Sequence, residues 1–189
     1  MKTRSLLNSL ALGAVLFGSY SSFAKEVAGV NLPDSVTVEG KELKLNGAGI
    51  RKKFIIKVYV GGLYLTAPAA DVKAITASDQ PWSVHMHFLR SVDKEKIVGA
   101  YREGFEKNSK DKVAILNAGL DKAQSAFVDM KEGSEMVVTY VPGKGTTLGI
   151  KGGAQKTVEG KDFADGLLRN WLGSEPADEN LKEAMLGKK

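Results

Sequence analysis

The sequence contains no cysteine and only two histidines among its 189 residues. The absence of cysteine excludes disulfides, thiol catalysis and cysteine-ligated metal sites, so the fold must be held by its core alone. The formal net charge is only +5, and the basic residues are scattered along the chain, which gives no support for nucleic-acid binding. After residue 24, no segment approaches the roughly 18 consecutive apolar residues of a membrane-spanning helix.

Residues 1–24 have the pattern of a secretory signal peptide. Two basic residues precede an apolar run over residues 6–17, and a small-x-small cleavage site ends at Ala24. The apolar run is too short to span a bilayer. We therefore expect a single domain over residues 25–189 that is periplasmic or secreted, has no stable membrane anchor, and carries a formal net charge of about +3.

The hydrophobic patterns of the remaining chain predict strands first, then two helices, then strands, then two helices. We expect strands over residues 36–38, 42–45, 54–60 and 63–65 (kinked or bulged at Gly61-Gly62), 82–89, 136–141 and 146–151, and helices over 67–77, 93–108, 113–130, 163–172 and from about Pro176. Such segregated runs predict an α+β fold, a mainly antiparallel sheet covered by helices on one face. The other face must be solvated or covered by something else.

Two glycine-rich stretches are similar to phosphate-binding loops but lack their spacing. After Gly47 and Gly49, Lys52 stands where the GxGxxG pattern needs a third glycine, and a strand follows instead of a helix. We interpret these glycines as residues that avoid steric crowding where a strand begins. The stretch at 143–147 departs from GxxxxGK[ST] and predicts a hairpin turn.

His85 and His87 share one face of an expected strand. Two imidazoles at this spacing can ligate zinc or copper, but a catalytic metal needs a third protein ligand, and no acidic residue nearby supplies it. We therefore interpret them as histidines on a solvated strand face and expect no metal site.

Arg51 follows the two glycines and stands beside Lys52 and Lys53, at the beginning of the most apolar expected strand. A guanidinium keeps its charge, so inside a fold it must meet an anion or a set of carbonyls, and its planar fork matches a carboxylate at two points. If this end of the strand faces a cavity, Arg51 would clamp an anionic ligand with an apolar tail. The alternative is a surface arginine that is solvated beside the two lysines.

The segment LNGAGIRKKFIIKVYVGGLYL resembles a stretch of chalcone isomerase-fold proteins that begins with GxGxR and ends in K-F-x-x-x-G-x-Y-L. Val58 replaces the phenylalanine. The matching positions are Lys57, Gly62, Tyr64 and Leu65. The segment LLRNWLGSEPADENLKEAMLG is similar to the same family's C-terminal helix, turn and helix. The resemblance covers residues 27–186 and is strongest to short, exported bacterial members. It implies an open-faced β-sandwich, with a large antiparallel sheet, a layer of helices and a ligand cleft between them.

The resemblance also suggests five ligand-binding residues: Arg51, Tyr59, Tyr101, Asn170 and Trp171. The essential arginine of the family falls on Arg51. Tyr59 stands where the isomerases carry a strand threonine, and Asn170, next to Trp171, stands where they carry a serine or threonine. Tyr101 is the only candidate for the family's catalytic tyrosine, or it is a core residue of its helix.

Two activities are implied by the resemblance. Plant members close a chalcone into a flavanone, and fatty-acid-binding members hold an acyl chain whose carboxylate meets an arginine and a tyrosine. Ring closure needs preorganised hydroxyl groups, which are largely replaced here. We therefore expect a non-catalytic binder of a small amphipathic acid such as a fatty acid, without a cofactor. The alternatives are an intramolecular lyase or isomerase acting on a chalcone or another α,β-unsaturated compound, and a structural protein whose cleft is filled beside Arg51.

Overall fold

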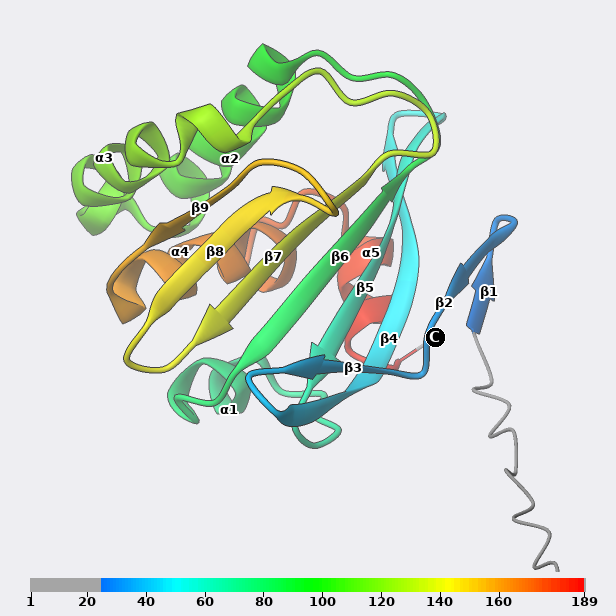
Figure 1. The fold of residues 1–189 in the computed structure, drawn as a ribbon, viewed down its shortest axis with the longest axis horizontal. Helices are drawn as coiled ribbons and strands as arrows, with labels where there is room; N and C mark the ends of the chain where they lie inside the picture. Colours follow the sequence, from blue (N-terminus) through cyan, green and yellow to red (C-terminus); the bar gives the residue numbers. More distant parts are fainter. Residues whose placement is uncertain (1–24, 189) are drawn as a thin grey trace, which may run out of the picture.

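The computed structural model describes residues 25–188, so the predicted signal peptide lies outside the described residues. A seven-stranded antiparallel sheet, in which each strand pairs with its neighbour in the chain, forms the centre of the fold (Figure 1). Its strands are β3 (Ser35–Val38), β4 (Lys41–Lys53), β5 (Ile56–Leu65), β6 (Trp82–Phe88), β7 (Glu135–Val141), β8 (Gly145–Ile150) and β9 (Gln155–Val158). The predicted antiparallel sheet is therefore confirmed.

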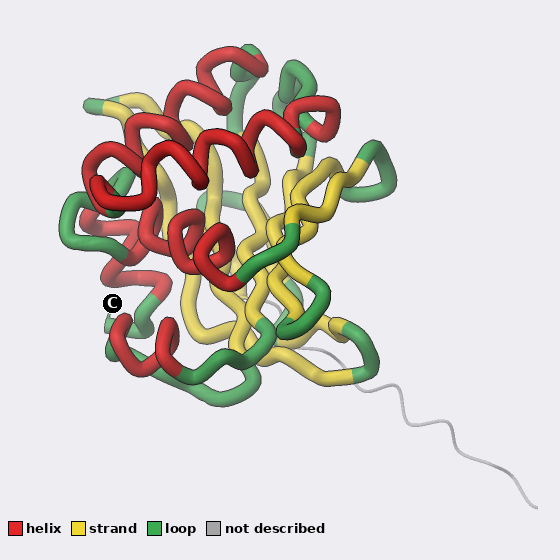
Figure 2. Tube along the Cα trace, turned by 90° about the vertical axis from the view of Figure 1, so that its left-hand side faces the viewer, coloured by secondary structure: helices red, strands yellow, loops and turns green. Residues whose placement is uncertain are grey.

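The helices gather on one side of this sheet (Figure 2). They are α1 (Val72–Ala77), α2 (Lys94–Asn108), α3 (Val113–Lys122), α4 (Lys161–Leu172) and α5 (Glu179–Met185), with short 3-10 turns at Lys110–Lys112 (η1) and Gln124–Ala126 (η2). No helix in residues 25–188 is long and apolar enough to cross a membrane. The predicted α+β fold with one helix-covered face is confirmed.

The main core lies between the sheet and the helices. Strand β6 alternates as predicted, and Val84, Met86 and Phe88 are buried on its inner face. The stripe on α2 meets them, since Ile97 and Phe105 are also buried. Burying each such side chain contributes about 1.5–3 kcal/mol, so this layer is the main source of stability.

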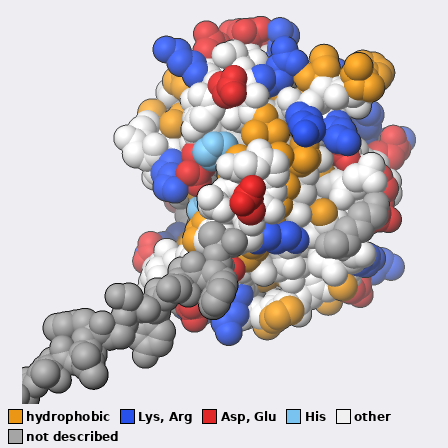
Figure 3. Space-filling view, turned by 90° about the vertical axis from the view of Figure 1, so that its right-hand side faces the viewer, with side chains coloured by type: hydrophobic (Ala, Val, Ile, Leu, Met, Phe, Trp, Pro, Cys, Tyr) orange, Lys and Arg blue, Asp and Glu red, His pale blue; other side chains and the backbone are white. Residues whose placement is uncertain are grey.

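The other face of the sheet is covered in part by a hairpin that the sequence did not predict. It consists of β1 (Lys25–Val27) and β2 (Val30–Leu32), and it lies beside β4 in Figure 1. Val30 and Leu32 of the hairpin form a second buried cluster with Ala48 and Val60 of the sheet. Figure 3, which views this side, shows hydrophobic side chains interrupted by charged ones and by histidine.

The prediction that Gly47 and Gly49 precede a strand and ease its beginning is wrong. Gly47 and Gly49 lie within the continuous strand β4, and the chain turns later, at Phe54-Ile55. These glycines are needed because α5 packs directly on the strand. A Cβ on Gly47 would collide with the Ala184 carbonyl, and one on Gly49 would lie 2.6 Å from the Ala184 Cβ.

The expected kink at Gly61-Gly62 is also wrong, because β5 runs unbroken and the register shifts lie in β4. A further error is the long helix over 113–130. It ends at Lys122, because Met130 exchanges two backbone hydrogen bonds of 2.9 Å with Val92 instead. Strand β9 was not predicted, and the last helix begins three residues after Pro176, with Asp178 as its cap.

Candidate functional site

Arg51 and Tyr59 face each other across the β4–β5 pair, on the side of the sheet that the helices cover. The Arg51 guanidinium carbon lies 5.7 Å from the centre of the Tyr59 ring, a cation–π distance. Arg51 is half-buried and Tyr59 is only 7% exposed. The structure therefore places the arginine at the border of the main core rather than among the fully solvated lysines that follow it.

Trp171 of α4 reaches Tyr59 from the opposite layer. Its indole Nε1–H donates a 2.9 Å hydrogen bond to the Tyr59 hydroxyl oxygen, and Trp171 is 2% exposed. The Tyr59 hydroxyl thus accepts one hydrogen bond and keeps its own proton to donate. Burial raises the pKa of Tyr59, an effect that Arg51 and the Trp171 hydrogen bond only partly offset, so the phenol stays neutral.

Tyr101 of α2 joins the same cluster. Its ring meets Trp171 edge-on at 5.9 Å and Phe127 at 5.8 Å between centroids. Its hydroxyl makes only a 3.9 Å contact to the Met86 sulfur, a weak acceptor. Burial raises the pKa of Tyr101, with a smaller opposing effect from Arg51. Tyr101 is therefore a core residue, as one of the two interpretations stated, and it also borders the predicted site.

Asn170 precedes Trp171 on α4 and points at α2. Its side chain occupies the space that a Cβ on Gly104 would fill, one helical turn after Tyr101. Asn170 is 5% exposed, yet neither its Oδ1 nor its Nδ2 has a hydrogen-bond partner within residues 25–188. A buried amide without partners is costly, so a bound water or a ligand group would stabilise it here.

Arg51 makes no direct ion pair with a carboxylate of the described residues. Two acids lie near enough to share its electrostatic surroundings, but both have other partners. Glu103 pairs with Lys107 at 2.6 Å, and the Asp178 carboxylate accepts backbone N–H groups of β4 and α5.

Four of the candidate residues, Tyr59, Tyr101, Asn170 and Trp171, are buried, and Arg51 lies half-buried at the border of the core. One hollow, of about 650 Å³, lies between α1, the end of α4 and α5, and another, of about 280 Å³, lies between residues 65–69, α1 and the beginning of β6. Neither is lined by Arg51, Tyr59, Tyr101, Asn170 or Trp171. An acyl chain could enter beside these residues only if side chains moved.

Three residues that the sequence did not single out complete the cluster: Met86, Phe127 and Gly104. The alternation of β6 predicted that Met86 points inward, but nothing in the sequence indicated that it meets Tyr101. The spacing of three between Tyr101 and Gly104 places both on one helix face. In the sequence, this spacing alone indicated that a small residue on the face of Tyr101 could leave room for a side chain of another helix, which is Asn170.

The histidines lie on the opposite face of the sheet. The His85 Nδ1 is 3.2 Å from a Glu135 oxygen, and its ring lies against the Tyr64 ring at 4.7 Å between centroids, tilted by 52°. The His85 side chain is only 12% exposed, so the prediction of a solvated face is wrong for this residue. No group of three metal-ligating side chains occurs among residues 25–188.

Comparison with known proteins agrees with this architecture. The sequence profile described as chalcone isomerase-like matches residues 24–187. The chain belongs to the chalcone isomerase-like family. The crystal structure of an Arabidopsis thaliana fatty-acid binding protein superposes with a TM-score of 0.63 at 17% identity, covering 84% of this chain and 92% of that one. At this identity, the likeness shows the fold alone. A search of curated protein sequences finds no significant match.

Proposed function

We propose that this chalcone isomerase-like protein is an exported, non-catalytic binder of a small amphipathic acid such as a fatty acid. The observation that carries the proposal is the half-buried Arg51, which has no carboxylate partner among the described residues and lies against Tyr59 at the border of the core. A ligand carboxylate would supply the missing anion in the two-point geometry that a guanidinium favours.

The neighbouring polar groups suit a carboxylate as well. Tyr59 and Tyr101 are neutral phenols, and burial raises the pKa of each further above its ordinary value, so both can donate hydrogen bonds to an anion. Asn170 has an unpaired amide that can donate to a ligand or accept from one. Together with the Arg51 cation, these donors would suit a negatively charged group without a cofactor.

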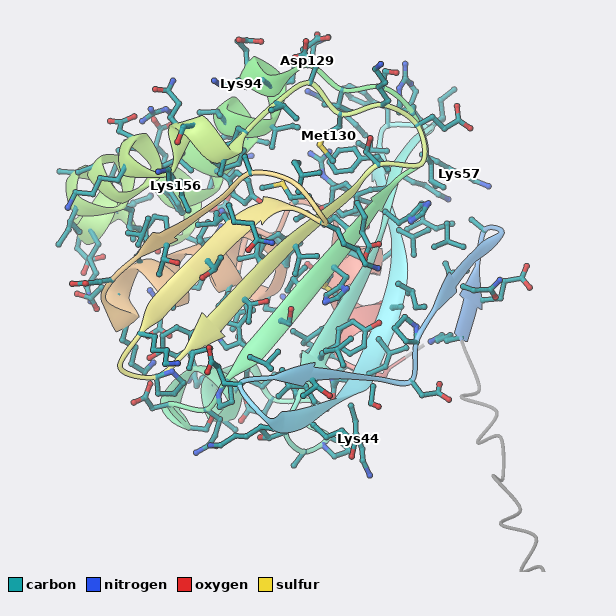
Figure 4. The ribbon with its side chains drawn as sticks, in the orientation of Figure 1. Lys44, Lys57, Lys94, Asp129, Met130 and Lys156 are labelled. Carbon is teal, nitrogen blue, oxygen red and sulfur yellow. The ribbon has the colours of Figure 1, made fainter. Side chains whose placement is uncertain are left out.

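The apolar tail would lie among the side chains that now fill the core beside the cluster. Met86 and Met130 are buried there, and in Figure 4 the labelled Met130 lies between the sheet and the loop that follows α3. Unbranched methionines adapt their shape at low cost, so they are suitable residues to yield to an acyl chain. The fold neighbour described as a fatty-acid binding protein supports the same ligand class.

The second candidate is a structural or interaction protein with a closed cleft. The observation in its favour is that Tyr59, Tyr101 and Trp171 are between 2% and 7% exposed and fill the space beside Arg51. The two candidates differ in one respect that can be measured, which is whether the purified protein carries a ligand.

The test is to purify the protein, denature it and identify released small molecules by mass spectrometry. We expect an amphipathic acid in wild type and a much reduced amount in Arg51→Ala, with Lys44→Ala in the same strand as the control. A protein that releases nothing, and that takes up added fatty acid equally well with and without Arg51, would favour the closed-cleft candidate. Loss of chalcone absorbance on adding the protein would instead support the lyase alternative.

A further inference from the structure

The turn between β4 and β5 contains the two most exposed large hydrophobic side chains of the described residues. Phe54 is 91% exposed, Ile55 is 92% exposed, and the following Ile56 is 45% exposed. These three residues, the β4–β5 tip, protrude from one end of the sheet (Figure 1). Contiguous exposed side chains of this size are uncommon on soluble proteins and mark interaction sites.

The backbone conformation of the tip is unfavourable for the residue that adopts it. Lys53 pairs with Ile56, so only Phe54 and Ile55 form the connection. Phe54 has φ +56°, a left-handed conformation that two-residue turns normally give to glycine or asparagine. A bulky aromatic residue here strains the turn and is exposed to water as well. Residues that violate two local rules at once are expected at functional positions.

The tip is bordered by unpaired positive charge. Lys52 and Lys57 are directly opposite each other across the two strands, an arrangement that destabilises a hairpin, and Lys53 is beside them. All three are exposed, and no ion pair among the described residues includes their ammonium groups. The labelled Lys57 points away from the sheet (Figure 4), and basic side chains lie near apolar ones at the upper edge of Figure 3.

We propose that the β4–β5 tip inserts reversibly into the surface of a bilayer that contains anionic phospholipids. Phe54 and Ile55 would enter the boundary between headgroups and acyl chains, while the three lysines would meet the lipid phosphates. The apolar residues at the turn and the lysines around them match the acyl chains and the anionic headgroups of such a bilayer. A second copy of the chain is not a matching partner, because a symmetric contact would bring the lysines of both copies together. The proposal is independent of what Arg51 binds.

The test uses a local reporter in the full chain. The two native tryptophans, Trp82 and Trp171, are buried. Quenching by lipid therefore reports mainly on the tryptophan introduced by Phe54→Trp. The matched control is Ile115→Trp, at a 61% exposed position on α3. Residues 1–24 are identical in both variants. Each variant is mixed with vesicles of brominated phosphatidylcholine, with or without phosphatidylglycerol, and the quenching of tryptophan fluorescence is measured.

We expect strong quenching of the Phe54→Trp reporter on anionic vesicles, several-fold above that of Ile115→Trp. Adding Lys53→Gln and Lys57→Gln should weaken vesicle binding by roughly five-fold for each lysine, and high salt should act in the same direction. Equal quenching of both reporters, or equal binding to neutral vesicles, would overturn the proposal. A shift of the Phe54→Trp emission with protein concentration, without vesicles, would assign the tip to self-association instead.

Discussion

The two faces of the central sheet treat polar side chains differently. On the outer face, polar groups pair with one another: Ser83 with Thr139 at 2.8 Å, Thr147 with Thr157 at 2.8 Å, and Tyr64 with the Pro33 carbonyl at 3.1 Å. The helix-covered side also contains paired groups, such as Trp171 with Tyr59 at 2.9 Å and Tyr140 with Asp79 at 2.6 Å. The buried side-chain atoms without partners within the described chain nevertheless belong to that side, to Asn117, Thr146 and Asn170. Arg51 lies on that side too.

This contrast separates the requirements of folding from those of binding. On the outer face, polar side chains find hydrogen-bond partners within the chain, as buried polar groups usually do. The groups that the proposed ligand would satisfy are Arg51, which makes no ion pair among the described residues, and the Asn170 amide, which has no partner within them. Substitutions on the two faces should therefore differ in their effect on stability.

The largest effect is expected where α2 and α4 meet. Gly104→Ala places a methyl group against the Asn170 amide, and overpacking should lower the free energy of unfolding by about 1–3 kcal/mol. Gly99→Ala in the same helix has open space around it and should instead raise this free energy by about 0.5–1 kcal/mol. Urea denaturation measures both. Equal stabilities would show that Asn170 is not fixed against α2.

Tyrosine-to-phenylalanine changes compare the faces directly. Tyr59→Phe leaves the buried Trp171 N–H without an acceptor and should lower the free energy of unfolding by about 1–2 kcal/mol. Tyr64→Phe should cost only about 0.5 kcal/mol, because Pro33 is exposed and its carbonyl can bind water. Thermal and urea unfolding give the two values. A Tyr59→Phe cost no larger than that of Tyr64→Phe would mean that the hydrogen bond to Trp171 contributes little.

Asn170→Leu tests whether the buried amide contributes to stability. Leucine has nearly the shape of asparagine and removes an unpaired buried amide, so the free energy of unfolding should stay constant or rise by up to about 1 kcal/mol. The outer-face counterpart Ser83→Ala breaks a paired hydroxyl and should lower it by about 1 kcal/mol. Chemical denaturation decides the stabilities. If Asn170→Leu proves clearly destabilising, the amide has a structural role that the contacts do not reveal.

The smallest effect concerns acid stability and the outer face. The His85 hydrogen bond, with help from Lys151, lowers the pKa of Glu135 to about 2 from its ordinary value of 4.5. A lowered carboxyl pKa gives stability that is complete above pH 4.5 and is lost as the pH falls toward 2. Between pH 7 and pH 3, wild type should therefore lose about 1 kcal/mol more than Glu135→Gln, after allowance for solvent screening. The control is Glu132→Gln at an exposed position, which should behave like wild type.

Much of the fold followed from the sequence because its signals are local. The alternation around Met86 and the four-residue stripe through Tyr101 each specify one buried face, and both are confirmed. The boundaries of β4 failed for a physical reason. Gly47 and Gly49 are required because α5 packs against them. That helix is more than 130 residues away in the chain, so no local pattern could reveal their role.

The candidate site was predictable in part for the same reason. The family resemblance brought forward Arg51 and Trp171, and the structure joins them through the Tyr59 ring and hydroxyl. It did not bring forward Met86 or Gly104, because their contacts depend on how α2 and α4 dock on the sheet. That the interior is filled could not be derived from spacing at all, since packing depends on the rotamers of several distant side chains.

The most direct test of the central claim is calorimetric titration with a sixteen-carbon fatty acid and its methyl ester. If Arg51 holds the carboxylate, wild type binds the acid more tightly than the ester. Arg51→Ala should then lose roughly ten-fold or more in affinity for the acid and little for the ester, with Lys44→Ala unchanged. Equal affinities of wild type and Arg51→Ala for the acid would contradict the account.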